Sequence, residues 1–378
     1  METPPPIFPR RKRHTRLALA PLAALWFGAS VIAIASAKTV LLAAPCPSFL
    51  CAVQFAVAAI GVRQVQPRVA ALPSGAPEFN LVSGLAASYT LGFLLTNAAF
   101  DVAAPSFVET FKAAEPLSTV GLAICFLGER ERTATYVSLI PIVIGVAIAS
   151  SSKVTFSVLG MALALLSNVS FSARAVLTKA LKKQFPESPA SASDAQLFYM
   201  VSRLGVLMLL PFALIFDART LWVVLVEQPA DGGDGGALQT ATAAVSGNAS
   251  SDLLMGGGLG GPPSPIDGSS SNSTGSNRMS PLRLLCWLLV NGVAHATYNG
   301  VSFAVLSRVS VASHAVLNMV RRIVCIAAAA AFFGTQISYY NWGGVALAAA
   351  GVWGFAKSKE RVRPALLPLT DPKKTRAV

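Results

Sequence analysis

Long apolar runs alternate with short polar breaks along most of this chain. A helix that crosses the hydrocarbon core of a bilayer needs about 20 mostly apolar residues. Ten runs approach that length, and they lie at 17–37, 47–66, 79–100, 104–127, 134–151, 155–178, 194–216, 282–304, 309–333 and 340–357. The pattern predicts an all-α integral membrane protein with about ten transmembrane helices.

The composition agrees with a membrane protein and excludes an ordinary soluble domain. Hydrophobic residues make up 53% of the chain and charged residues 12%, whereas a soluble domain carries about 25% charged residues. The net charge of +13 would suit nucleic acid, but many basic residues gather in two tails at 1–16 and 358–378. Basic flanks beside apolar spans are typical of the cytosolic side of a membrane protein. We therefore expect a lipid bilayer, and no nucleic acid, as a partner.

The basic residues of the short loops predict the orientation. One side of the membrane would hold Arg63, Arg68, Arg130, Arg132, Lys179, Lys182, Lys183 and Arg308, and the other side only Lys38 and Lys153. Because Lys and Arg are retained in cytosolic loops, both termini and both basic tails are predicted to be cytosolic.

One long segment interrupts the apolar pattern. Residues 228–281 are dominated by Gly, Ser, Ala and Pro, a composition that cannot bury enough apolar surface to order itself. The orientation places this segment opposite the cytosol, where its sequons at Asn248 and Asn272 would be accessible to glycosylation. The first apolar run has an alternative interpretation as a signal peptide, because it ends in Ala35-Ser36-Ala37.

The chain repeats itself. Phe126-Leu127-Gly128 corresponds to Phe332-Phe333-Gly334, and Gly145 and Lys153 correspond to Gly351 and Lys359 at the same offset. This predicts two transmembrane halves, at 17–151 and 155–357, with five helices each. Five is an odd number, so the second half would have the opposite topology. Inverted repeats are typical of transporters, whose substrate site lies near the midplane between the halves.

Few ionisable residues lie inside the apolar runs, and most of them are basic. An ionisable group at the bilayer centre costs at least about 2.5 kcal/mol, so it usually faces a cavity or a partner. The runs at 104–127 and 309–333 carry Lys112, Arg321 and Arg322 against Glu109 and Glu115. In a continuous helix, Lys112 and Glu115 would share one face and could pair. The remaining excess of positive charge predicts an anionic ligand, and Arg and Lys are well suited to phosphate.

Two further runs add to this excess, because they carry Arg174 and Arg203. His295 and His314 are more simply interpreted as packing or hydrogen-bonding residues than as proton carriers. The sequence contains no recognisable nucleophile, metal or phosphate-loop motif. We therefore predict that the protein is not an enzyme and needs neither a metal nor a cofactor.

Several motifs together resemble the triose-phosphate translocator family of the drug/metabolite transporter superfamily. They are Leu25-Trp26-Phe27, Ser106-Phe107-Val108-Glu109-Thr110-Phe111-Lys112-Ala113-Ala114-Glu115-Pro116, Phe126-Leu127-Gly128-Glu129, Asn168-Val169-Ser170 with Arg174, Tyr298 with Val301-Ser302, Arg308-Val309-Ser310, His314 and Asn318-Met319-Val320-Arg321-Arg322. The resemblance covers nearly the whole chain apart from the tails and the 228–281 segment.

The resemblance implies a secondary transporter that exchanges a phosphorylated metabolite for inorganic phosphate by alternating access. It implies ten helices in two inverted five-helix halves. By the same resemblance, Lys112, Arg321 and Arg322 would bind phosphate, and Thr96 and Tyr298 would line the same site. The resemblance also makes Arg174 a gate residue or an ion-pair partner of Glu115.

The sequence departs from the family pattern at three positions. Arg321 stands where plastid members have Lys, and Phe93 stands where the triose-phosphate carriers have a His one turn before Thr96. Phe93 is thus a candidate for substrate specificity. Glu109 stands where plastid members often have His, and it would repel an anionic substrate if it faced the cavity. We expect Glu109 to point away or to pair.

The substrate and the organelle stay open. A sugar phosphate, a triose phosphate or phosphoenolpyruvate fits the three cations. A nucleotide-sugar transporter of the endomembrane system is the main alternative, since the sequons favour it. A membrane enzyme acting on lipid phosphates and a receptor-like protein are less favoured. A multi-pass protein of the Golgi and endomembranes or of the plastid envelope is expected, and the oligomeric state is not indicated.

Overall fold

The computed structural model describes most of the chain. The described residues are 14–65, 72–73, 75–128, 132–151, 157–225, 279–306, 308–309 and 311–360. Within these ranges the regular structure is helical and no strand occurs. Most of the two basic tails and of the 228–281 segment, with its sequons, lies outside the described residues.

Helices occupy each of the ten predicted ranges. The first half contains α1 (His14–Ala43), α2 (Pro47–Val65), α3 (Ala76–Val102), α4 (Pro105–Lys112), α5 (Glu115–Leu127) and α6 (Thr133–Ala149). The second half contains α7 (Val158–Gln184), α8 (Pro189–Ala192), α9 (Asp194–Phe212), the π-helix η1 (Ala213–Asp217), α10 (Ala218–Leu225), α12 (Pro281–Leu306), α13 (Val311–Phe332) and α14 (Tyr339–Glu360).

Among the residues that the structure describes, five helical segments are long and apolar enough to cross a membrane. They are Leu19–Ala43, Pro47–Val65, Ala76–Val102, Val158–Gln184 and Asp194–Val223. The prediction of an all-α membrane protein is therefore confirmed, while the count of ten spans stays a prediction.

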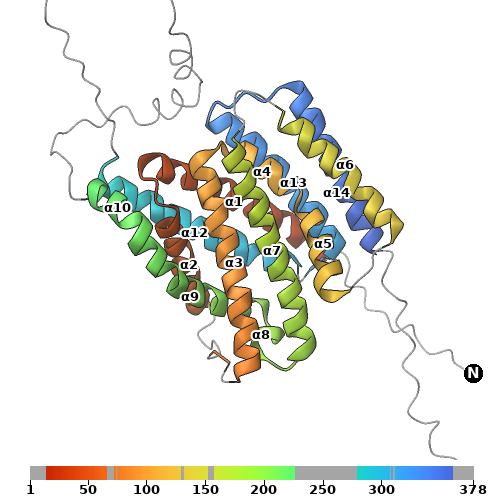
Figure 1. The fold of residues 1–378 in the computed structure, drawn as a ribbon, viewed down its shortest axis with the longest axis horizontal. Coiled ribbons are helices and arrows are strands. Elements are labelled where there is room, and N and C mark those ends of the chain that lie inside the picture. Colours follow the sequence, from red (N-terminus) through yellow and green to blue (C-terminus); the bar gives the residue numbers. More distant parts are fainter. Residues whose placement is uncertain are drawn as a thin grey trace, which may run out of the picture.

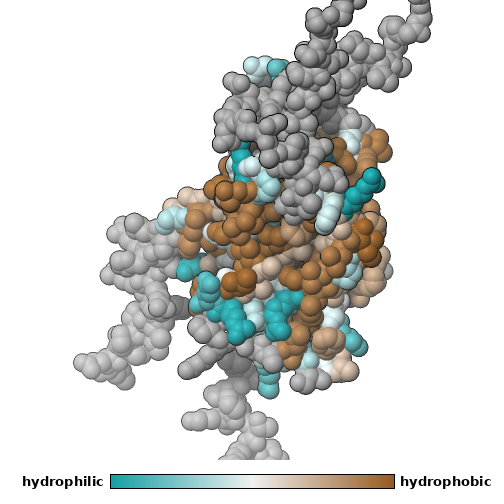
Figure 2. Space-filling view, turned by 90° about the vertical axis from the view of Figure 1, so that its left-hand side faces the viewer, coloured by the Kyte–Doolittle hydropathy of each residue, from teal (hydrophilic) through white to brown (hydrophobic). Residues whose placement is uncertain are grey.

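The surface agrees with a lipid environment. Many large apolar side chains are exposed, among them Leu214, Ile215 and Phe216 of η1. Figure 2 shows a broad area of hydrophobic side chains on one face, with hydrophilic side chains gathered mostly below it in that view. Monomeric soluble proteins rarely expose a broad apolar surface, so this face suits lipid.

The helix pairs recur when the two halves are exchanged. In the order of the repeat, α1 corresponds to α7, α3 to α12 and α6 to α14. The most extensive contacts join α6 with α14, α3 with α7, and α1 with α12. Figure 1 shows α6 and α14 side by side at one end of the molecule, and α3 beside α7. Exchanging the halves turns the α3–α7 pair into the α12–α1 pair, as a two-fold relation between them would require.

The repeated glycines have matching structural roles. Gly128 ends α5 with φ of 64°, and Gly334 follows α13 with φ of 65°. Left-handed glycines commonly end helices because they carry no Cβ. Gly145 of α6 faces α14 so closely that a Cβ would overlap the backbone of Ala348. Small residues of this kind let helices approach in lipid.

The predicted helix at 104–127 is not continuous. The chain forms α4, turns at Ala113 and Ala114, and starts again as α5. Pro116 lies in the first turn of α5. A proline in a helix interior lacks the N–H that would bond four residues back, and its ring clashes with that carbonyl. Starting a new helix just before Pro116 avoids both problems, and the expectation of one helix was wrong.

Candidate functional site

A cavity of about 220 Å³ lies among α1, α2, α3, α4, α5, α7, α12 and α13. The residues that the resemblance assigns to the substrate site meet at this cavity. The cavity is lined by Phe93, Thr96, Lys112, Glu115, Arg174, Tyr298, Arg321 and Arg322, together with Glu109. The fold thus brings these residues together, and their binding roles stay predictions.

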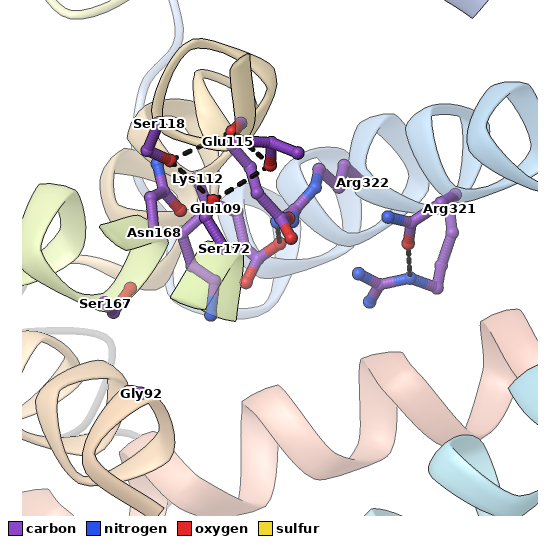
Figure 3. Close-up of polar contacts among 12 residues, drawn as sticks. Gly92, Glu109, Lys112, Glu115, Ser118, Ser167, Asn168, Ser172, Arg321 and Arg322 are labelled. Carbon is purple, nitrogen blue, oxygen red and sulfur yellow. Dashed lines mark hydrogen bonds and ion pairs between the residues drawn. The ribbon is translucent and has the colours of Figure 1, made fainter. Parts of the chain in front are cut away.

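Arg322 is the most completely paired cation of the cavity. Its Nη1 lies 3.2 Å from Oε2 of Glu109, and its Nη2 lies 2.7 Å from Oε2 of Glu115. Figure 3 shows Arg322 pointing from α13 toward both carboxylates. Glu109 therefore forms an ion pair, which is one of the two outcomes expected from the sequence. Glu115 pairs with Arg322 rather than with Lys112 or Arg174. Because of the break after α4, Lys112 and Glu115 do not share a helix face.

Lys112 is buried and contacts neutral groups. Its Nζ donates a hydrogen bond of 2.8 Å to Oγ1 of Thr96, and it lies 4.9 Å from the centre of the Phe171 ring. Thr96 in turn donates to the carbonyl oxygen of Gly92. An ammonium group has three donors, and Thr96 accepts one of them. Lys112 thus keeps donors available for a ligand.

The guanidinium of Arg321 lies apart from the two carboxylates (Figure 3). Its Nε donates to Oδ1 of Asn318 at 3.0 Å, and its guanidinium lies 5.9 Å from the centre of the Trp26 ring. Within the described part of the chain, Arg321 forms no ion pair. The guanidinium of Arg321 is therefore a second cationic group at the cavity that forms no ion pair among the described residues.

Arg174 also lines the cavity without an ion pair among the described residues. Its guanidinium lies 5.1 Å from the centre of the Tyr89 ring, and its buried Nε has no hydrogen-bond partner there. Arg174 does not pair with Glu115, whose partner is Arg322. The role of Arg174 as a gate stays a prediction. Arg203 is exposed, stacks on Tyr199 and does not line the cavity. The expectation that Arg203 adds to the positive charge of the site was wrong.

An aromatic cluster forms the wall around Phe93. The centre of the Phe93 ring lies 4.9 Å from that of Tyr89, 5.0 Å from that of Phe171 and 4.6 Å from that of His295. Each pair is arranged edge to face. Nε2 of His295 is buried and has no hydrogen-bond partner among the described residues. A substrate group near Phe93 would thus meet mainly apolar surface, with one imidazole behind it.

A buried amide network at the cavity was missed in the sequence. Asn97 donates to Gln54, Gln54 donates to Asn291, and Asn291 donates to Ser36 and to the carbonyl oxygen of Ala33. These bonds join α1, α2, α3 and α12. Neutral amides carry no charge signal, but their positions inside apolar runs could have revealed them.

The turn between α4 and α5 is held from α7. Nδ2 of Asn168 donates to the carbonyl oxygen of Phe111 at 3.0 Å. The hydroxyl of Ser172 lies 2.8 Å from that of Ser118 and 2.9 Å from that of Thr119. These contacts satisfy polar groups at the break and fix the end of α4, where Lys112 lies.

Fold and site together define a helical membrane protein with a cationic cavity that helices of both predicted halves line. The model of the Triose-phosphate Transporter family matches residues 17–244 and 266–356, which is most of the chain. The chain belongs to this family.

The similar curated proteins are named as phosphate translocators. The chain is 28% identical over 333 residues to "Phosphoenolpyruvate/phosphate translocator 2, chloroplastic" of Arabidopsis thaliana, which covers 86% of this chain and 73% of that protein. It is 28% identical over 355 residues to "Triose phosphate/phosphate translocator, non-green plastid, chloroplastic" of Brassica oleracea var. botrytis, covering 92% and 74%. It is 25% identical over 275 residues to "Glucose-6-phosphate/phosphate translocator 1, chloroplastic" of Arabidopsis thaliana, covering 73% and 58%.

Proposed function

We propose that this protein is a secondary transporter that exchanges a phosphorylated metabolite for inorganic phosphate by alternating access. Membership of the family and the names of the relatives support this function. The observation that carries it is the pair Lys112 and Arg321, two cations that face one cavity and form no ion pair within the described residues. Phosphate oxygens accept strong, charge-assisted hydrogen bonds from such groups.

The binding roles follow from the free donors. Lys112 would give phosphate the N–H bonds that Thr96 does not take, and Arg321 would give the outer edge of its guanidinium. Arg322 would join them once phosphate competes with its carboxylates. Tyr298 lines the same cavity and would hydrogen-bond the substrate through its hydroxyl. The cations come from α4 and α13, so a bound anion would link the two halves.

The same reasoning disfavours the alternatives. A nucleotide-sugar transporter remains the second candidate. The relatives are named as chloroplastic phosphate translocators, which favours phosphate exchange in a plastid over an endomembrane protein. A membrane enzyme is less favoured, because the relatives are named as translocators. The cavity combines cations, two carboxylates, amides and aromatic rings.

Counter-exchange in liposomes tests the function. The full chain is reconstituted in vesicles loaded with inorganic phosphate, and the uptake of labelled phosphate, triose phosphate, phosphoenolpyruvate, glucose 6-phosphate and a nucleotide sugar is compared. We expect phosphate-dependent uptake of phosphate and of at least one phosphorylated metabolite. Uptake of the nucleotide sugar alone would contradict the proposal.

The orientation is a separate proposal with its own test. The charge bias of the short loops places both termini in the cytosol and the 228–281 segment on the other side. Protease added to sealed vesicles of known orientation should cut that segment only from the non-cytosolic face. Cleavage from the cytosolic face would reverse the assignment.

A further inference from the structure

Lys38 lies just beyond one end of the cavity and joins two of the helices that line it. The last residue of α1 that lines the cavity is Ala37, and the last of α3 is Phe100. Lys38 follows Ala37 within α1. Its Nζ donates hydrogen bonds of 2.7 Å to the carbonyl oxygen of Phe100 and of 3.1 Å to that of Asp101. The structure thus places Lys38 inside α1, rather than in a loop, and ties it to the last turn of α3.

This contact between Lys38 and the end of α3 is called the Lys38 latch below. We propose that the latch holds this end of the cavity closed, and that Lys38 releases α3 whenever the cavity opens on this side. The inference rests on the proposed function, because a carrier that exposes one site alternately to two sides needs a closure at each end. It assigns a conformational role to a residue that does not itself line the phosphate site.

The latch satisfies carbonyl oxygens that the end of a helix leaves without partners. In the last turn of α3, the oxygen of Ala99 accepts from the N–H of Ala103, and those of Phe100 and Asp101 accept from Lys38. A cation is favourable at a helix C-terminus, and a charge-assisted hydrogen bond is strong. Lys38 is only 7% exposed. The latch is therefore a buried, strong contact, and water can replace it at both partners once this end opens.

The buried amide network forms a second, neutral tie beside the latch. Asn291 of α12 donates to Ser36 of α1, two residues before Lys38. Gln54 of α2 connects Asn291 to Asn97, which lies one turn before the latched end of α3. Both ties join α1 and α12 to α3 at the same end of the cavity. This end is thus closed by polar contacts that reach from one helix to the next.

The latch also crosses a boundary between well-packed helix pairs. The helix α1 packs extensively with α12, and α3 packs extensively with α7, whereas α1 and α3 contact each other far less. Alternating access largely moves groups of helices as rigid bodies around a central site. A sparsely packed boundary between two well-packed pairs is where such a movement disrupts the fewest contacts. Lys38 lies on that boundary and holds it closed.

The latched end lies on the side toward which the 228–281 segment leaves the helices. The helix α2 begins shortly after α1 ends, and the N–H of Phe49 in its first turn donates to Oδ2 of Asp217 at 2.6 Å. Asp217 ends η1, and α10 carries the same apolar helical segment onward toward residue 225 (Figure 1). Opening of this end therefore exposes the cavity to the compartment that the 228–281 segment faces.

Access of a thiol reagent to the cavity tests the latch. Ile34→Cys places a thiol in the cavity wall one turn before Lys38, in a full chain whose five native cysteines are replaced by Ala. A membrane-impermeant reagent is added to either face of sealed vesicles, and protease cleavage of the 228–281 segment identifies the faces. We expect Lys38→Met to raise the labelling rate about tenfold from the face where that segment is cut, as loss of a hydrogen bond to a charged group predicts. Labelling from the opposite face should not rise.

Lys182→Met is the matched control. It removes a lysine that pairs with Asp194 at 2.9 Å at the surface and does not line the cavity, so labelling from both faces should stay unchanged. If Lys38→Met does not insert, Lys38→Gln replaces it. That variant removes the charge and shortens the side chain, so a raised rate from the same face supports the latch and an unchanged rate overturns it.

The outcomes separate this inference from the proposed function. An unchanged or lower labelling rate in Lys38→Met overturns the latch alone, as long as the unmodified chain exchanges phosphate in liposomes. An equal increase from both faces reflects general loosening of the helices and also overturns it. Absence of exchange by the unmodified chain overturns the proposed function, and with it the inference that rests on it.

Discussion

The α4–α5 segment and α13 hold corresponding places in the two halves, yet they are built differently. The helix α13 runs unbroken over 22 residues, whereas its counterpart stops at Lys112 and begins again at Glu115. The two elements contact each other mainly through α4, and Arg322 also pairs with Glu115 of α5. The two elements thus occupy corresponding positions, and the break before Pro116 makes them unlike.

The break gives the first half two helix ends in the middle of the segment, which the unbroken α13 lacks. A helix end carries a partial charge, negative at the C-terminus and positive at the N-terminus. Lys112 lies in the last turn of α4 and Glu115 in the first turn of α5, so each side chain suits the helix end beside it. Among the charged side chains that line the cavity, the unbroken α13 brings only the cations Arg321 and Arg322. Acids enter the site from one half alone, and they meet the cation of the other half.

Removing Arg322 should break this meeting point with the largest effect. In Arg322→Ala, Glu109 and Glu115 lose their shared partner, and the proposed phosphate site loses a donor. Loss of one partner of a desolvated charge pair costs about 2–5 kcal/mol, so phosphate exchange should fall below detection. Exchange rates in liposomes, with the inserted protein quantified, provide the measurement.

Arg321→Lys is the milder companion of that variant. It keeps the positive charge and removes only the planar fork, so exchange should persist with a reduced rate. Normal transport by Arg322→Ala would place phosphate recognition elsewhere in the molecule.

Restoring a continuous helix at the break should have an intermediate effect. Pro116→Ala supplies the missing N–H and allows α4 and α5 to join, which would rotate Glu115 away from Arg322. We expect exchange to fall about tenfold, the order of one lost charge contact. Pro105→Ala is the control, because Pro105 lies in the first turn of α4, where the N–H has no helical partner. Equal effects of both variants would show that the break does not matter.

The sequence predicted the helices well but not their breaks. Lipid requires long apolar segments, and the runs therefore marked each helical range. Proline alone could not locate the break, since Pro21 and Pro141 lie inside continuous helices. Pro211 is followed by the π-helix η1. A proline leaves the carbonyl oxygen four residues before it without its helical partner. Whether neighbouring helices satisfy this oxygen decides between a continuous and a broken helix, and this depends on tertiary packing.

The candidate site could be predicted for its charges but not for their pairing. The cost of ionisable groups in lipid identified Lys112, Arg321 and Arg322 as members of one site. The partner of Glu115 was misjudged because Arg322 lies 207 residues away in sequence, and only the fold brings them together. The sequence offered Lys112, a neighbour along the chain, and the resemblance offered Arg174, but neither pointed to Arg322.

Changing Phe93 should have the smallest effect on rate and alter selectivity. Phe93 lies in the first half and contacts His295 of the second half. Phe93→His adds a hydrogen-bonding group one turn from Thr96 on the same helix face. We expect preference to shift toward triose phosphate or 3-phosphoglycerate, with phosphate–phosphate exchange retained. Competing uptake rates in the wild type and the variant give the ratio, and an unchanged ratio would mean that Phe93 does not contact the substrate.

Direct binding of labelled inorganic phosphate to the purified protein tests the central claim, that the cations of α4 and α13 together form one phosphate site. Wild type, Lys112→Ala and Arg322→Ala are compared with Asp194→Asn, whose acid lies outside the cavity. The account predicts saturable binding by the wild type and Asp194→Asn, and a loss of about a hundredfold or more in affinity in each of the other two, as expected for a lost charge-assisted contact. Wild-type affinity in either Lys112→Ala or Arg322→Ala would contradict the claim.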